Sequence, residues 1–109
     1  MTHLLIVDDE AHVLNALRRM LLNAAAPPVL HDLELTTFTS PMEALEHAAH
    51  HRIDLVISDY RMPGMDGVSF LTRVAALQPD SARIILSAYA DMEGIVRAIN
   101  EAGIFRFVG

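Results

Sequence analysis

Three carboxylates and one hydroxyl, on Asp8, Asp9, Asp59 and Ser87, follow three short apolar runs of the sequence. Carboxylates that are crowded together repel one another, so a site that holds them must either keep a proton or bind a cation. Oxygen ligands without His or Cys suit Mg²⁺, Ca²⁺ or Mn²⁺ better than zinc. Because Mg²⁺ is often bound by a few carboxylates together with a phosphate, this set of residues points to phosphoryl chemistry.

Each of these side chains has a predicted role in that chemistry. A carboxylate can attack phosphorus and form an acyl phosphate when a metal offsets the charge that builds up. Asp59 is the predicted nucleophile, because it stands alone at a strand end before a loop. Asp8 and Asp9 would hold the metal, and the Ser87 hydroxyl would hydrogen-bond a phosphoryl oxygen. The alternative is that each residue only caps a following helix, as Asp commonly does, but four such positions at three strand ends favour a site.

Short β-rich apolar runs alternate along the chain with longer runs of helical spacing, which is typical of a parallel α/β sheet. The predicted strands cover residues 4–7, 33–38, 54–58, 82–86 and 105–108. The predicted helices cover about 13–21, 41–50 and 68–77, with a fourth from Asp91 to Gly103. The sequence Ser40-Pro41-Met42-Glu43 indicates where one helix begins, since it combines an N-cap hydroxyl, a Pro at the first position and a Glu three residues after the cap.

The predicted fold is therefore a doubly wound, five-stranded parallel sheet with the flavodoxin-like strand order 2-1-3-4-5. In such sheets ligands bind beyond the carboxyl ends of the strands, where the strand order reverses. Strands one, three and four are neighbours in this order. The fold would thus bring Asp8, Asp9, Asp59 and Ser87 into one pocket.

Size, composition and charge limit what this sequence can be. A chain of 109 residues, 52% of them hydrophobic, fits a single domain over residues 1–109. With no Cys, it has no thiol ligand or nucleophile. A net charge of −6 with only 8 Lys and Arg argues against direct nucleic-acid binding. No apolar stretch could span a bilayer and no signal peptide is recognisable, so we expect a cytoplasmic protein without a membrane partner.

The same residues carry a resemblance to a known family. Asp8-Asp9 after a first strand, Ser87-Ala88 after a fourth, and the stretch Asp59-Tyr60-Arg61-Met62-Pro63-Gly64-Met65-Asp66-Gly67 after a third resemble the receiver domain of bacterial response regulators. The resemblance covers the whole chain. It implies a phosphoacceptor domain of a two-component system, phosphorylated by a sensor histidine kinase or phosphotransfer protein. It also implies a domain that is not an enzyme in its own right, although it promotes its own phosphorylation and dephosphorylation.

The resemblance assigns roles to individual residues. It implies that Asp59 is the phosphoacceptor, that Asp9 and Asp59 bind Mg²⁺ directly, and that Asp8 binds it largely through water. The backbone carbonyl of Arg61 would be a further metal ligand. Ser87 matches the residue that moves toward the phosphoryl group, and Phe107 matches the aromatic switch residue on strand five. Arg61 and Met62 after Asp59, and Tyr89 after Ser87, would flank the pocket.

The resemblance also implies how the signal leaves the site. Phosphorylation adds about −1.5 to −2 charges at one point. Movement of Ser87 and Phe107 would then change the surface of helix four and strand five, which could serve a homodimer, an output domain or a partner protein. The last eight residues, 102–109, resemble receivers attached to cyclic-dinucleotide phosphodiesterase domains.

The sequence departs from the family pattern at its end. The family has a Lys after strand five, and here that position would come directly after Gly109. The final helix is also missing from this sequence. We therefore expect a receiver domain trimmed at its C-terminus, with any output domain downstream.

Two rival readings remain open at this stage. One is a receiver-like interaction module that is never phosphorylated; the missing Lys favours it and the intact acidic residues speak against it. The other is a Mg²⁺-dependent phosphohydrolase, which would need a second Asp two residues after the nucleophile, where this chain has Arg61.

His47, His50 and His51 are spaced as they would be on one helix. Since no carboxylate or thiolate in a pocket is evident nearby in the sequence, we expect a solvated helix end rather than a metal site. Met62 and the other methionines are expected to fill gaps in the packing.

Overall fold

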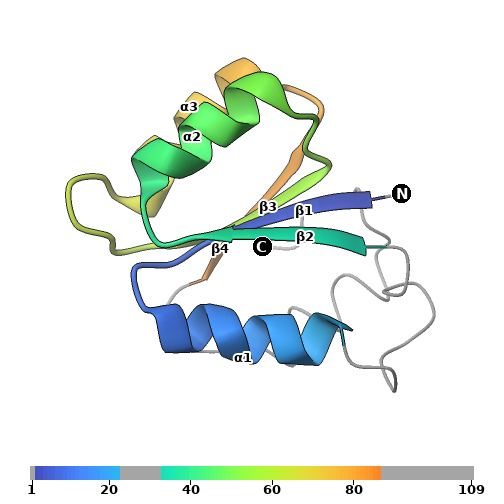
Figure 1. The fold of residues 1–109 in the computed structure, drawn as a ribbon. Helices are drawn as coiled ribbons and strands as arrows, with labels where there is room; N and C mark the ends of the chain where they lie inside the picture. The colour runs from blue at the N-terminus through green and yellow to red at the C-terminus, as the bar shows by residue number, and fades with distance from the viewer. Residues whose placement is uncertain (1, 23–32, 87–109) are drawn as a thin grey trace.

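The computed structural model describes residues 2–22 and 33–86, which form a parallel sheet with helices on both faces (Figure 1). The strand order is β2-β1-β3-β4, and every neighbouring pair is parallel. The strands are β1 (Thr2–Val7), β2 (Leu33–Phe38), β3 (Leu55–Asp59) and β4 (Ala82–Leu86). The helices are α1 (Ala11–Leu22), α2 (Pro41–His50) and α3 (Gly67–Leu77). The predicted fold class and the order of the first four strands are confirmed.

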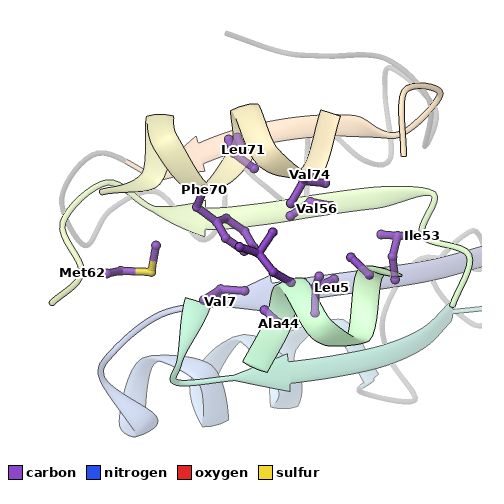
Figure 2. Close-up of a cluster of buried hydrophobic side chains, with 11 residues drawn as sticks. Leu5, Val7, Ala44, Ile53, Val56, Met62, Phe70, Leu71 and Val74 are labelled. Carbon is purple, nitrogen blue, oxygen red and sulfur yellow. The ribbon is translucent and has the colours of Figure 1, made fainter. Parts of the chain in front are cut away.

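The alternation of side chains along β1 and β3 divides the core into two layers. Leu4 and Ile6 point to the face covered by α1, together with Leu17 and Leu21 of that helix. Leu5 points to the other face, where α2 and α3 pack side by side (Figure 1). Figure 2 shows this second cluster gathered around the Phe70 ring. Both faces of the central strands are therefore buried, as their continuous apolar sequence predicts.

The predicted beginning of α2 is confirmed in detail. Ser40 is the N-cap, its Oγ accepts a hydrogen bond from the backbone N–H of Glu43 at 3.3 Å, and Pro41 occupies the first turn.

The third strand covers Leu55–Asp59, one residue later at each end than the predicted 54–58, and Asp54 lies just before it. Its carboxylate accepts hydrogen bonds from the backbone N–H of His3 at 2.9 Å and from Arg52 Nε at 3.1 Å, which ties the beginning of β1 to the segment before β3. At the other end the strand extends through Asp59, which pairs in register with Leu86. The predicted nucleophile is therefore held by the sheet itself.

The Gln78 side chain joins the ends of two helices on the α2–α3 face. Its Nε2 donates to the carbonyl oxygens of Ala48 and His51, both at 2.8 Å, and its Oε1 accepts from Ile53 N–H at 3.4 Å. The α2 carbonyls at a helix end would otherwise lack partners within the helix.

We expect Gln78→Ala to lower the free energy of unfolding by about 1–2 kcal/mol, because two carbonyls lose their donor. Gln78→Glu keeps the shape of the side chain but cannot donate, so it should destabilise by at least as much. Urea denaturation measures both values. A Gln78→Glu variant as stable as the parent chain would show that donation to these carbonyls contributes little.

The predicted strand at 105–108 and the helix from Asp91 to Gly103 lie outside the described residues.

Candidate functional site

Asp8, Asp9 and Asp59 meet at the carboxyl edge of the sheet. Asp8 and Asp9 follow the end of β1, Asp59 is the last residue of β3, and these two strands are neighbours. One carboxylate oxygen from each residue lies within 4.8 Å of those of the other two. Within residues 2–22 and 33–86 this is the one group of three or more acidic, His or Cys residues with that geometry. The three carboxylates therefore lie together as the predicted topology requires, while their roles as metal ligands and phosphoacceptor stay predictions.

The three carboxylates differ in their surroundings. Asp8 is only 5% exposed, Asp59 is half-buried and Asp9 faces solvent. Asp8 Oδ1 accepts a hydrogen bond from the backbone N–H of Glu10 at 2.9 Å, and its own N–H donates to the carbonyl of Phe38 in β2 at 3.2 Å. Asp8 is therefore fixed from both sides, while Asp9 forms the open side of the site.

Crowding and burial make two of these groups weaker acids than usual. Burial, together with the charges of Asp59, Asp9 and Glu10, raises the pKa of Asp8 from 3.8 to about 6, although the Glu10 hydrogen bond opposes the shift. Burial also raises the pKa of Asp59, and the neighbouring Asp9 adds to this, while hydrogen bonds from the backbone of Tyr60 and Arg61 oppose it. A bound cation would offset the repulsion among these carboxylates, so the site is suited to a cation.

The donor set fits a hard divalent cation. All three groups offer oxygen, which Mg²⁺, Ca²⁺ and Mn²⁺ prefer. The open side at Asp9 leaves room for water or for the oxygens of a phosphate, both of which Mg²⁺ usually retains among its ligands. The residues present therefore fit the Mg²⁺ that the sequence led us to expect.

The loop after β3 is shaped so that α3 can begin close behind Asp59. Gly64 has φ of +81°, a left-handed conformation that favours glycine. Asp66 is the N-cap of α3, and its Oδ1 accepts from Ser69 N–H at 2.8 Å. Gly67 N–H then donates to the carbonyl of Tyr60 at 2.7 Å, which closes the loop.

Gly67 is a site residue to which the sequence prediction gave no role. A Cβ atom at this position would overlap with the backbone carbonyl oxygen of Asp59 and lie 3.1 Å from Tyr60 Cα. Only glycine lets the first turn of α3 approach the backbone of Asp59 this closely. The signal in the sequence was a glycine directly after the Asp66 N-cap, but the contact itself is tertiary.

The remaining predicted site residues fall into two groups. Arg61 is exposed beside Asp59, whereas the Met62 side chain is buried in the α2–α3 face cluster (Figure 2), in keeping with the gap-filling role expected of methionine. That the Arg61 carbonyl binds the metal and that Met62 flanks the pocket remain predictions. Ser87, Tyr89 and Phe107 lie outside the described residues.

Residues 4–109 match the family profile of the response regulator receiver domain. The chain is 36% identical over 104 residues to the hydrogenase transcriptional regulatory protein HoxA of Cupriavidus necator, which covers 95% of this chain and 20% of that protein. It is 35% identical over 107 residues to the cyclic di-GMP phosphodiesterase response regulator RpfG of Xanthomonas campestris, covering 97% and 27%. The chain thus spans about a fifth to a quarter of these relatives.

A solved structure supports the same assignment. The signal receiver domain of an HD domain-containing protein from Pseudomonas fluorescens Pf-5 superposes with a TM-score of 0.68 at 32% identity, covering 98% of this chain and 74% of that one. In the part of the chain that the structure describes, no helix has the length and apolar character needed to cross a bilayer. The sheet order, the acidic site at its carboxyl edge and the match over residues 4–109 together show that this chain belongs to the response regulator receiver domains of two-component systems.

Proposed function

We propose that this domain accepts a phosphoryl group on Asp59 from a phosphohistidine of a sensor kinase or phosphotransfer protein, with Mg²⁺ held beside it. The observation that carries the proposal is the convergence of Asp8, Asp9 and Asp59 at the end of β3 and β1. Asp59 pairs with Leu86 in the sheet, so the backbone position of the residue that would attack phosphorus is fixed. Membership in the receiver family supports the same role.

The transfer is a substitution at phosphorus. A carboxylate oxygen of Asp59 forms a new P–O bond while the P–N bond of the phosphohistidine breaks, and the imidazole leaves with the electron pair of that bond. Bound Mg²⁺ would supply positive charge to the phosphoryl oxygens. Asp8 and Asp9, with the Arg61 carbonyl, would hold it in place.

The response to phosphorylation belongs to the same proposal. Ser87 would hydrogen-bond the phosphoryl group and Phe107 would change position with it, with Met62 and Tyr89 beside the pocket. The changed surface of helix four and strand five would then act on an output domain, a partner protein or a second copy in the cytoplasm. The names of the two relatives indicate two kinds of output, transcriptional regulation and cyclic di-GMP phosphodiesterase activity. The region that both relatives share with this chain is the receiver domain.

The raised pKa of Asp8 predicts that Mg²⁺ binding depends on pH. With a pKa of about 6 in place of 3.8, the metal-free folded chain holds this proton more tightly than the unfolded chain does. The stability that this group contributes is therefore complete below pH 3.8 and is lost as the pH rises through about 6. Mg²⁺ needs the ionised carboxylate, so its affinity should fall several-fold between about pH 7.5 and about pH 5.5.

Calorimetric titration with Mg²⁺ at the two pH values measures this effect, and the unfolding temperature should rise with Mg²⁺ mainly at the higher pH. Asp80→Asn, in the exposed turn before β4, is the matched control and should show the same pH dependence as the parent chain. Equal Mg²⁺ affinity at both pH values would contradict a metal-binding role for Asp8.

Incubation with acetyl phosphate, followed by intact-mass measurement, tests the proposed function itself. We expect one added phosphoryl mass in the presence of Mg²⁺ and none after chelation of the metal with EDTA. No adduct under either condition would favour an interaction module that works without phosphorylation. Repeated release of inorganic phosphate from a small phosphoester would instead favour a phosphohydrolase.

A further inference from the structure

A cavity lies at the opposite edge of the sheet from the three aspartates. It occupies about 280 Å³ where the C-terminal end of α2 meets the first residues of β1 and β2. Its polar lining is rich in imidazole, supplied by three separate elements of the fold. The polar lining residues are His3, Glu34, Thr36, His47, His50, His51 and Arg52. The sequence does not show this grouping, because His3 and Glu34 are far from residues 47–51 in the chain. Pairing of β1 with β2 and packing of α2 on the sheet bring them together.

Two of the rings have an oxygen partner close to Nδ1, one by ion pairing and one by a hydrogen bond. His3 Nδ1 lies 2.8 Å from Glu34 Oε2, and His51 Nδ1 lies 3.1 Å from the carbonyl oxygen of His47. A histidine that binds a metal through Nε2 usually donates its Nδ1–H to a carboxylate or a backbone carbonyl, which fixes the tautomer. His3 and His51 both have an oxygen on the Nδ1 side of the ring, which leaves Nε2 as the nitrogen available to a metal.

The third ring, that of His47, is held between two others. It stacks on His51 with centroids 4.3 Å apart and an angle of 11°, and it packs tilted against Phe38 at 5.5 Å. Burial lowers the pKa of His47, the positive charges available to His51 and His3 lower it further, and only Glu34 opposes this. The ring is therefore neutral near pH 7, which is the form that binds metals.

The other charged groups at the cavity have partners of their own. His50 Nε2 pairs with Glu46 at 3.2 Å, and Arg52 Nε pairs with Asp54 at 3.1 Å. The buried Asp54 carboxylate therefore balances the charge of Arg52, which lessens the repulsion between Arg52 and a cation in the cavity.

We propose that His3, His47 and His51 form a binding site for a borderline transition-metal ion such as Zn²⁺, with Glu34 orienting His3. The helical spacing of the α2 histidines alone predicted a solvated helix end, for want of a carboxylate in a pocket. The fold supplies both the carboxylate and the pocket. The ligand nitrogens of the three rings do not all lie within 4.8 Å of one another, so binding would require the side chains to rearrange, including separation of the stacked His47 and His51 rings.

The two sites would prefer different metals, because their ligand atoms differ. Imidazole nitrogen favours Zn²⁺, Ni²⁺ and Cu²⁺, whereas the carboxylates of Asp8, Asp9 and Asp59 suit Mg²⁺. The proposed site stands independently of phosphorylation, since it shares no residue with the acidic site.

Zn²⁺ titration of the 109-residue chain in excess Mg²⁺ tests the proposal by calorimetry. We expect one Zn²⁺ to bind, and His47→Gln with His51→Gln together to weaken binding by at least about tenfold. His12→Gln is the matched control, because His12 is exposed on α1 and pairs with Glu10, and it should bind like the parent chain. Asp9→Asn should also bind like the parent chain. Unchanged affinity in the double variant, or loss of Zn²⁺ binding in Asp9→Asn, would overturn the proposal.

A second variant keeps the test valid if the double variant is poorly folded. Glu34→Gln leaves an exposed side chain of the same shape but removes the charge behind His3, and loss of such a partner typically weakens metal binding by about 10–100-fold. Ring signals of His3, His47 and His51 in NMR spectra should move with Zn²⁺ while those of His12 stay in place. Movement confined to His12, or full Zn²⁺ affinity in Glu34→Gln, would count against the site.

Discussion

Replacement of Asp59 by Asn is expected to lower phosphoryl uptake from acetyl phosphate by roughly 10³-fold or more, because the proposed nucleophile is removed. The amide has almost the same shape as the carboxylate, so the residue can still pair with Leu86 at the end of β3. Its nitrogen and oxygen cannot form a stable acyl phosphate. Intact-mass measurement over time gives the rate for the parent chain and the variant.

The same substitution should stabilise the metal-free fold. The pKa of Asp59 is raised, which means that its charged form is disfavoured beside Asp8 and Asp9. Asn carries no charge, so the unfolding temperature of Asp59→Asn near pH 7 without Mg²⁺ should exceed that of the parent chain. Asp80→Asn controls for the loss of one negative charge at an exposed turn, and it should change neither property. Parent-like phosphoryl uptake in Asp59→Asn would place the acceptor elsewhere.

Gly67→Ala is expected to have the second-largest effect, on both stability and transfer. The added methyl group would overlap with the carbonyl oxygen of Asp59, and backbone atoms cannot move aside as a flexible side chain can. We expect a loss of about 2–3 kcal/mol in the free energy of unfolding, typical of an overpacked site. Displacement of Asp59 by about 1 Å should also slow phosphoryl transfer by about 10²-fold.

Gly64→Ala is the matched control for this substitution. Gly64 also lies in the loop between β3 and α3, but nothing lies within 4 Å of a Cβ built there. Its cost should come only from its φ of +81°, about 1 kcal/mol, with transfer close to the parent rate. Urea denaturation and the acetyl phosphate assay, applied to both variants, separate backbone strain from displacement of the nucleophile. Equal transfer rates in Gly67→Ala and Gly64→Ala would contradict a positioning role for Gly67.

Local patterns were sufficient to predict most of the described fold. The Ser40-Pro41 cap gave the correct start of α2, because an N-cap hydroxyl and a first-turn Pro act within a few residues. The apolar runs gave β2 and β4 with their observed bounds, and the alternation of runs implied parallel strands. The acidic site followed from that topology, since parallel strands bring their carboxyl ends to one edge.

Features that depend on tertiary contacts could not be predicted in this way. The overlap between Gly67 and Asp59, the hydrogen bonds from Gln78 to α2 and the pairing of His3 with Glu34 each join residues through the packed fold. The histidines show the consequence most clearly. Their helical spacing predicted a solvated helix end, which fits the exposure of His50 and His51, and only the sheet brings Glu34 and the His3 imidazole to the same cavity.

Mapping the phosphoryl group to its residue is the most direct test of the proposed function. Borohydride reduction of the acetyl phosphate-treated protein converts an aspartyl phosphate into homoserine, which tandem mass spectrometry locates in a peptide. We expect homoserine at position 59 in the Mg²⁺-treated chain, and unmodified Asp8 and Asp9 in the same sample. Homoserine at position 8 or 9, or none at any position despite bound Mg²⁺, would contradict the assignment of Asp59 as the phosphoacceptor.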